Sequence, residues 1–88
     1  MPTKPYITTI SIIVKNRHKN ISKVNSLLTT YGHLVLARLG ISIERHCLQG
    51  CTGAISVIVE GTKTEITDLT KKLNILVGVN AKSIIMTK

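Results

Sequence analysis

The order of apolar patterns along this chain restricts its fold more than any other feature. Segments rich in β-branched residues alternate with helical segments in the order strand, helix, strand, strand, helix, strand. Because strand–helix–strand crossovers are right-handed, this order predicts a four-stranded antiparallel sheet with both helices on one face. We therefore predict an α+β, ferredoxin-like βαββαβ two-layer sandwich that occupies residues 1–88 as a single domain.

The strands are expected at residues 6–15, 34–43, 53–61 and 79–87, and each helix carries its own boundary signals. Asn20 is placed to cap the start of the first helix, and Gly32 can adopt the left-handed conformation that ends it. Thr62 and Glu65 have capping-box spacing at the start of the second helix, and Gly78 is expected to close it.

Both faces of the strands are apolar. In the first strand Ile10, Ile12 and Val14 point one way, while Ile7 and Ile13 point the other. In the second strand, residues 35, 37, 39, 41 and 43 are assigned to one face and residues 34 and 36 to the other, with a bulge or bend expected at residue 40. In a sheet with one solvent-exposed face, apolar and polar residues alternate more regularly along each strand. The outer face is therefore expected to be covered by another copy of the chain, in a dimer or tetramer.

Nucleic acid is a weaker candidate partner for the same face. Ferredoxin-like sheets that recognise RNA stack bases on exposed aromatic residues of the strands. The predicted central third strand has none, since Tyr6 and Tyr31 are the only aromatic residues of the chain. Nucleic acid binding would then rest on phosphate contacts alone.

The chain is strongly basic, with twelve Lys and Arg against four Asp and Glu and a net charge of +8. Lys15, Arg17, Lys19 and Lys23 cluster where the first strand passes into the first helix. Such a cluster is typical either of an anion site or of a solvated loop. No apolar run reaches membrane-spanning length, and the start "MPTKPY" lacks the apolar core of a signal peptide, so we expect a cytoplasmic protein without a membrane contact.

His46, Cys47 and Cys51 stand within six residues, in the predicted connection between the second and third strands. Thiolates and an imidazole suit zinc, iron or copper, so a transition metal or iron–sulfur site shared between subunits is one interpretation. Two free thiols and a redox disulfide are the alternatives.

Arg38 is a second unusual residue, because it is an arginine in the middle of an apolar strand. It either emerges at an oligomer interface, pairs with a carboxylate such as Glu60, or meets an anionic ligand. The neighbouring Gly40 would allow a close backbone approach. No nucleophile–base pair, paired carboxylates or glycine-rich phosphate loop can be found, so we expect no catalytic residue and no enzyme.

Several ordered segments resemble a known family: "VNSLLTTYG" (24–32), "ARLGI" (37–41), "VEGT" (59–62), "LTKKLNILVGV" (69–79) and "KS" (82–83). The chain is similar to the small family of iron-only hydrogenase system regulators, which are stand-alone ACT-like domains. The resemblance covers nearly the whole chain. It implies a regulatory, ligand-sensing homo-oligomer without a DNA-binding domain of its own.

Two site predictions accompany the resemblance. The family's arginine before the first helix corresponds to Arg17, and its arginine–hydrophobic–glycine segment corresponds to Arg38 and Gly40; these three residues are the candidate ligand-binding set. The fold is related to the C-terminal domain of nickel-responsive repressors, but the repressors' His-x-His pair and following cysteine are not reproduced by His46, Cys47 and Cys51. No nickel site is therefore carried over.

Two functions remain open from the sequence. The first is a non-catalytic regulatory module that binds a small molecule or a metal and passes that state to a partner. The second is a structural or assembly protein whose basic surface docks on an acidic protein and senses no ligand.

Overall fold

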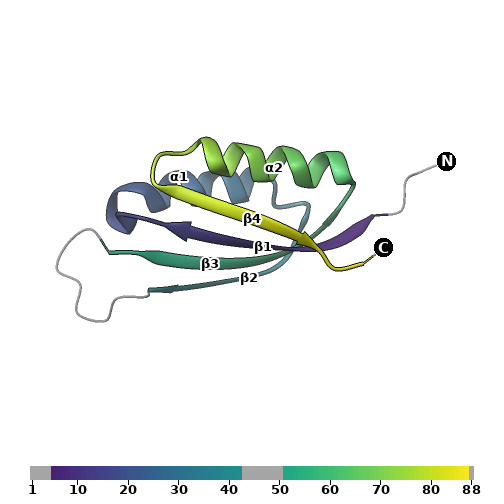
Figure 1. Ribbon diagram of the computed structural model, residues 1–88, viewed down its shortest axis with the longest axis horizontal. Helices are drawn as coiled ribbons and strands as arrows, with labels where there is room; N and C mark the ends of the chain where they lie inside the picture. The colour runs from purple at the N-terminus through teal and green to yellow at the C-terminus, as the bar shows by residue number, and fades with distance from the viewer. Residues whose placement is uncertain (1–4, 43–50, 88) are drawn as a thin grey trace.

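The computed structural model describes residues 5–42 and 51–87. Its elements in chain order are β1 (Tyr6–Val14), α1 (Arg17–Thr30), β2 (Val35–Ser42), β3 (Gly53–Gly61), α2 (Lys63–Ile75) and β4 (Val79–Ile85) (Figure 1). The predicted order of the six elements is confirmed, and the third strand has the predicted bounds.

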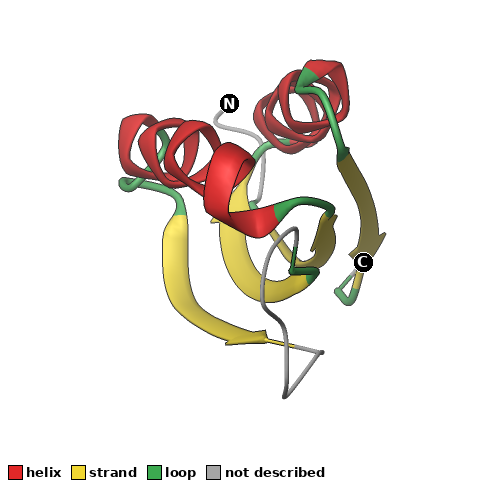
Figure 2. Cartoon of the chain, turned by 90° about the vertical axis from the view of Figure 1, so that its left-hand side faces the viewer, coloured by secondary structure: helices red, strands yellow, loops and turns green. Residues whose placement is uncertain are grey.

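The four strands form one antiparallel sheet in the order β2-β3-β1-β4. Both helices lie on one face of this curved sheet (Figure 2). The two central strands, β1 and β3, are joined over their whole length, from Tyr6 opposite Gly61 to Val14 opposite Gly53. The predicted ferredoxin-like sandwich is thus confirmed.

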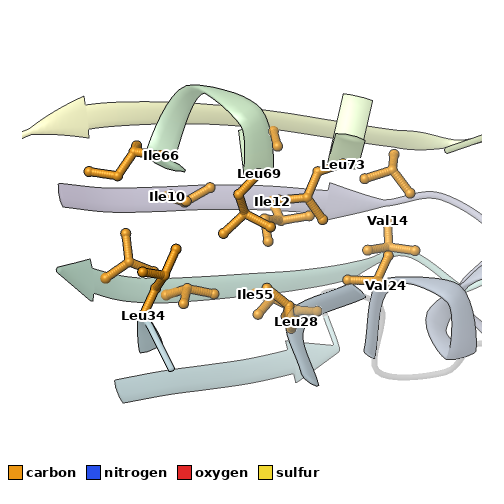
Figure 3. Packing of buried hydrophobic residues seen from close by; sticks show 14 residues of the cluster. Ile10, Ile12, Val14, Val24, Leu28, Leu34, Ile55, Ile66, Leu69 and Leu73 are labelled. Atoms are coloured by element: carbon orange, nitrogen blue, oxygen red, sulfur yellow. The ribbon is translucent and has the colours of Figure 1, made fainter. Parts of the chain in front are cut away.

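The core lies between the sheet and the two helices, and its main cluster among the described residues consists of Ile, Leu, Val and Ala side chains. Alternate residues of β1 and β3 point into it, and Leu69 and Leu73 descend from α2 onto Ile10 and Ile12 of β1 (Figure 3). Val24 and Leu28 of α1 fill the other half. The apolar residues of β1 that alternate with these core residues point to the other side of the sheet and stay partly or largely exposed. The helices therefore cover only one of the two apolar faces.

The predicted bulge at Gly40 is wrong. The register shifts between Val35 and Ala37, whereas Gly40 pairs regularly with Ile55. At this shift two residues of β2 oppose one residue of β3. Because side chains alternate along a strand, the extra residue moves every later side chain of β2 to the opposite face of the sheet. Arg38 therefore lies opposite the buried Val57, on the helix-covered side, and the predicted grouping of residues 35, 37 and 39 on one face does not hold.

The predicted boundaries of α1 are also wrong. The helix begins at Arg17, and its N-cap is Asn16, which adopts the left-handed conformation (φ 51°) that asparagine tolerates better than most residues. Asn20 lies inside the first turn, where its side chain is buried and donates to the Lys15 carbonyl at 2.7 Å. The helix ends at Thr30, and Gly32 is not left-handed; its N–H donates to the Thr29 carbonyl, while the Tyr31 N–H donates to the Leu27 carbonyl.

The start of α2 follows the prediction. Thr62 and Glu65 form a reciprocal capping box, in which the Glu65 N–H donates to the Thr62 hydroxyl and the Thr62 N–H donates to the Glu65 carboxylate. The hydrogen bond from the Thr62 backbone lowers the pKa of Glu65. The helix ends at Ile75 with Leu76 as its C-cap, and Gly78, the residue expected to close it, lies two residues beyond the cap with a positive φ of 74°. Across the described ranges, neither helix is both long and apolar enough to cross a membrane.

Candidate functional site

A cavity of about 250 Å³ lies between α1 and the adjoining strands β2 and β3. Its lining consists of two arginines, one amide and small or aliphatic residues: Arg17, Ile21, Asn25, Arg38, Gly40, Ala54 and Ile55. The three residues of the candidate ligand-binding set thus line one cavity, although Arg17 is 21 positions before Arg38. No carboxylate is among these lining residues, and we call the cavity the arginine pocket.

Arg38 reaches the arginine pocket because of the register shift in β2. Its guanidinium Nη2 donates to the Asn25 side-chain oxygen on α1, which holds the arginine across the gap between strand and helix. Glu60, the carboxylate considered as its partner, lies opposite Ile7 in the β1–β3 register. Its side chain therefore belongs to the face of the sheet that the helices do not cover. Among the described residues, no carboxylate forms an ion pair with Arg38.

Arg17 enters the same pocket from the first position of α1. Its side chain lies directly over Gly53, where a Cβ atom would stand only 2.8 Å from Arg17 Cδ. Glycine therefore leaves the space that the arginine stem occupies. The Arg17 Nε atom is buried and has no hydrogen-bond partner among the described residues. A buried guanidinium N–H without an acceptor is costly, and an anion entering the pocket would relieve that cost.

The start of α1 adds positive potential to this end of the pocket. The Asn16 side chain makes no capping hydrogen bond, and the first turn contains no acidic residue. Lys15 and Lys19 are exposed beside it. A helix N-terminus carries partial positive charge, so it does not neutralise the charge of these lysines. Both the lysines and the helix start therefore favour an anion at this end of the pocket.

The candidate metal residues are only partly within the described chain. Cys51 is buried and disulfide-bonded, so the alternative of a free thiol does not hold for it in this structure. His46 and Cys47 lie outside the described residues. A disulfide sulfur offers no thiolate to a metal ion, and the metal or iron–sulfur site therefore stays a prediction for the reduced chain.

Sequence reasoning missed one neighbour of this sulfur. The His18 Nε2 atom lies 3.2 Å from Cys51 Sγ, and the Arg17 N–H donates to the Cys51 carbonyl, so the start of α1 rests on the residues just before β3. His18 and Cys51 are 33 positions apart, and no local spacing could have paired them. Within residues 5–42 and 51–87, no group of three or more His, Cys, Asp or Glu side chains is placed to hold a metal ion.

Comparisons with known proteins match this chain to a family. The TM1266-like family model, described as "Iron-only hydrogenase system regulator, putative", matches residues 6–83. Among solved structures, the uncharacterized protein TM1266 from Thermotoga maritima is similar, with a TM-score of 0.85 and 23% identity over 96% of this chain and 100% of that one. At this identity the structural likeness shows the fold alone. Comparison with curated proteins gave no match.

Proposed function

Because this chain belongs to the TM1266-like family of iron-only hydrogenase system regulators, we propose that it is a non-catalytic regulatory module that senses a small anion in the arginine pocket. The observation that carries this proposal is the convergence of Arg17 and Arg38 in one cavity without a carboxylate. A guanidinium binds a carboxylate or a phosphate through two parallel N–H donors, which gives both strength and orientation. The buried Arg17 Nε supplies one donor that no described residue uses.

The pocket residues also explain how binding would reach the rest of the molecule. Arg38 stands on β2 and is held by Asn25 of α1, while Arg17 begins α1 and packs on Gly53 of β3. An anion between the two arginines would therefore link one helix to two strands, and it would stabilise their relative position.

We expect inorganic phosphate or a small dicarboxylate to raise the melting temperature of the wild-type protein in a concentration-dependent way. Removing one charge with Arg38→Gln is expected to weaken binding by about tenfold or more, because hydrogen bonds to charged groups contribute about 1.5–3 kcal/mol. The measurement is a thermal titration with chloride at matched ionic strength as the reference, combined with nitrogen-15 amide spectra to locate the bound anion.

The matched control is Lys63→Gln, which removes one exposed positive charge at the start of α2, outside the pocket lining. It should leave the affinity unchanged. Equal weakening by both variants would mean general charge screening, and amide shifts confined to other parts of the chain would place the anion elsewhere; either result contradicts the proposal.

We further propose that the module is a homo-oligomer joined through the outer face of the sheet. This face exposes large aliphatic side chains from all four strands: Ile13 (37% exposed), Leu39 (67%), Ile58 (41%) and Ile84 (62%). Among the described strand residues, the charged side chains on this face are Glu60 and Lys82. Their charges have opposite signs, so two copies could approach without net repulsion. An exposed sheet face with several large aliphatic side chains favours association.

We expect the wild-type protein to be a dimer or tetramer at micromolar concentration, measured by sedimentation or light scattering. Leu39→Lys should shift it toward the monomer with an unchanged circular dichroism spectrum, because a desolvated lysine at an apolar interface is costly. Ile75→Lys, on the helix side of the sandwich, is the control and should not alter the oligomeric state. A wild-type monomer under these conditions would exclude this assembly.

A further inference from the structure

A second hollow lies between the two helices, and it shares no lining residue with the arginine pocket. Its volume is about 470 Å³. The lining residues, from α1, α2 and the position after α2, are Ser22, Lys23, Ser26, Leu27, Thr30, Lys72, Ile75 and Leu76. The two helices lie side by side on the sheet (Figure 2), and we call this hollow the helix groove.

The helix groove is lined by three aliphatic side chains and, along one wall, by small residues. Ile75 is 78% exposed although it is a large aliphatic residue, and Leu27 and Leu76 are only partly buried beside it. On the α1 side, Ser22, Ser26 and Thr30 recur at every fourth position, so this wall has short side chains on one helix face. Short side chains let a third helix approach closely.

The charges of the helix groove are all positive. Lys23 forms no ion pair among the described residues. Lys72 donates to the Tyr31 hydroxyl at 2.7 Å and lies 3.3 Å from the Asp68 carboxylate, so its charge is partly balanced. The hydrogen bond with Tyr31, followed by the one with Asp68, raises the pKa of Lys72.

We propose that the helix groove binds an acidic amphipathic helix from a protein partner. Apolar residues of such a helix, spaced at i, i+3, i+4 and i+7, would cover the exposed Ile75 and the aliphatic side chains beside it, and its carboxylates would meet Lys23 and Lys72. The net charge of +8 favours an acidic partner. A second copy fits less well, because a twofold contact would bring the lysines of both copies together.

The inference extends the proposed function by naming the surface through which a regulator without a second domain can act on another protein. It does not depend on anion sensing, because the two cavities are lined by different residues. Loss of phosphate binding and loss of helix binding are therefore separate results.

The test uses a synthetic, terminally blocked helical peptide of about 20 residues, long enough to form a helix when bound. One face carries leucine and alanine, and the other carries glutamate. The reference peptide has the same composition in a scrambled order. Nitrogen-15 amide spectra of the full chain at low ionic strength should show shifts in α1 and α2 with the amphipathic peptide, and binding at least about tenfold weaker with the scrambled one.

Two protein variants locate the contact. Ile75→Asp, at an exposed position, should weaken the binding of the amphipathic peptide by about tenfold or more. The new carboxylate would lose solvation in the contact and would repel the glutamates of the peptide. Lys23→Glu should weaken the binding of the amphipathic peptide, and the affinity that remains should depend much less on salt concentration. Thr67→Asp, at an exposed position of α2 outside the groove lining, is the matched control and should leave the affinity unchanged.

Three results would overturn the proposal. The first is equal binding of the amphipathic and scrambled peptides, which indicates nonspecific charge attraction. The second is a change of oligomeric state in Ile75→Asp, which makes a second copy the occupant. The third is binding of anionic phosphatidylglycerol vesicles that Ile75→Asp abolishes, in the absence of peptide binding, which makes a membrane surface the occupant.

Discussion

Replacing Leu69 with alanine is expected to lower the free energy of unfolding by about 2–5 kcal/mol. Leu69 is fully buried and points from the middle of α2 toward β1 (Figure 3). Its truncation removes apolar surface burial and leaves a cavity that the stiff, β-branched neighbours Ile10 and Ile12 cannot refill easily. Since small domains have a total stability of about 5–15 kcal/mol, this loss is a large share of it. Urea unfolding followed by circular dichroism measures the change.

Ile75→Ala is the matched control, since it truncates an aliphatic side chain of equal size on the same helix. Ile75 is 78% exposed, so the change should stay within about 0.5 kcal/mol. The packing of α2 on the sheet would be contradicted if the two variants were destabilised equally, because that result would require both positions to be buried.

Replacing Gly78 with alanine is expected to lower the free energy of unfolding by about 1–3 kcal/mol, the cost of a strained backbone conformation. Gly78 has a φ of 74°, and a Cβ atom there would stand 2.7 Å from the Asn20 side-chain nitrogen and 3.2 Å from the Lys15 carbonyl oxygen. These groups are already bonded: Asn20 donates to the Lys15 carbonyl, and the Lys15 N–H donates to the Gly78 carbonyl. The substitution would therefore also disturb the contact between the β1–α1 and α2–β4 turns.

Gly40→Ala is the control for Gly78→Ala. Its new methyl group would meet only Ile55 Cγ1, at 3.9 Å, which is ordinary van der Waals contact, and its φ is not positive. Unfolding free energies from urea titrations should differ from wild type by no more than about 0.5 kcal/mol for Gly40→Ala. If Gly78→Ala were equally mild, the turn would not need a left-handed residue.

The candidate ligand residues show how far pattern reasoning reaches into a site. Arg17 stood out because basic residues cluster before the first helix, and Arg38 because a charge interrupts an apolar strand. Neither signal indicates that the two arginines share a cavity. That depends on the crossover from α1 to β2, on the small residue at Gly53 beneath Arg17, and on the bond between Arg38 and Asn25. Asn25 is marked only by the resemblance of the segment 24–32 to the family, and that resemblance indicates no contact with Arg38.

The order of elements and the aliphatic core could be predicted from the chain alone, because hydrophobic periodicity and the capping box of Thr62 and Glu65 are local properties. The sheet topology followed from that order through the handedness of strand–helix–strand crossovers. Which side chains of β2 face the helices could not be predicted in this way. The extra residue between Val35 and Ala37 is visible only against the pairing with β3, and it turns Arg38 from the outer face to the helix side. Register is a relation between two strands, so the residues of one strand cannot reveal it, and the arginine pocket exists because of that relation.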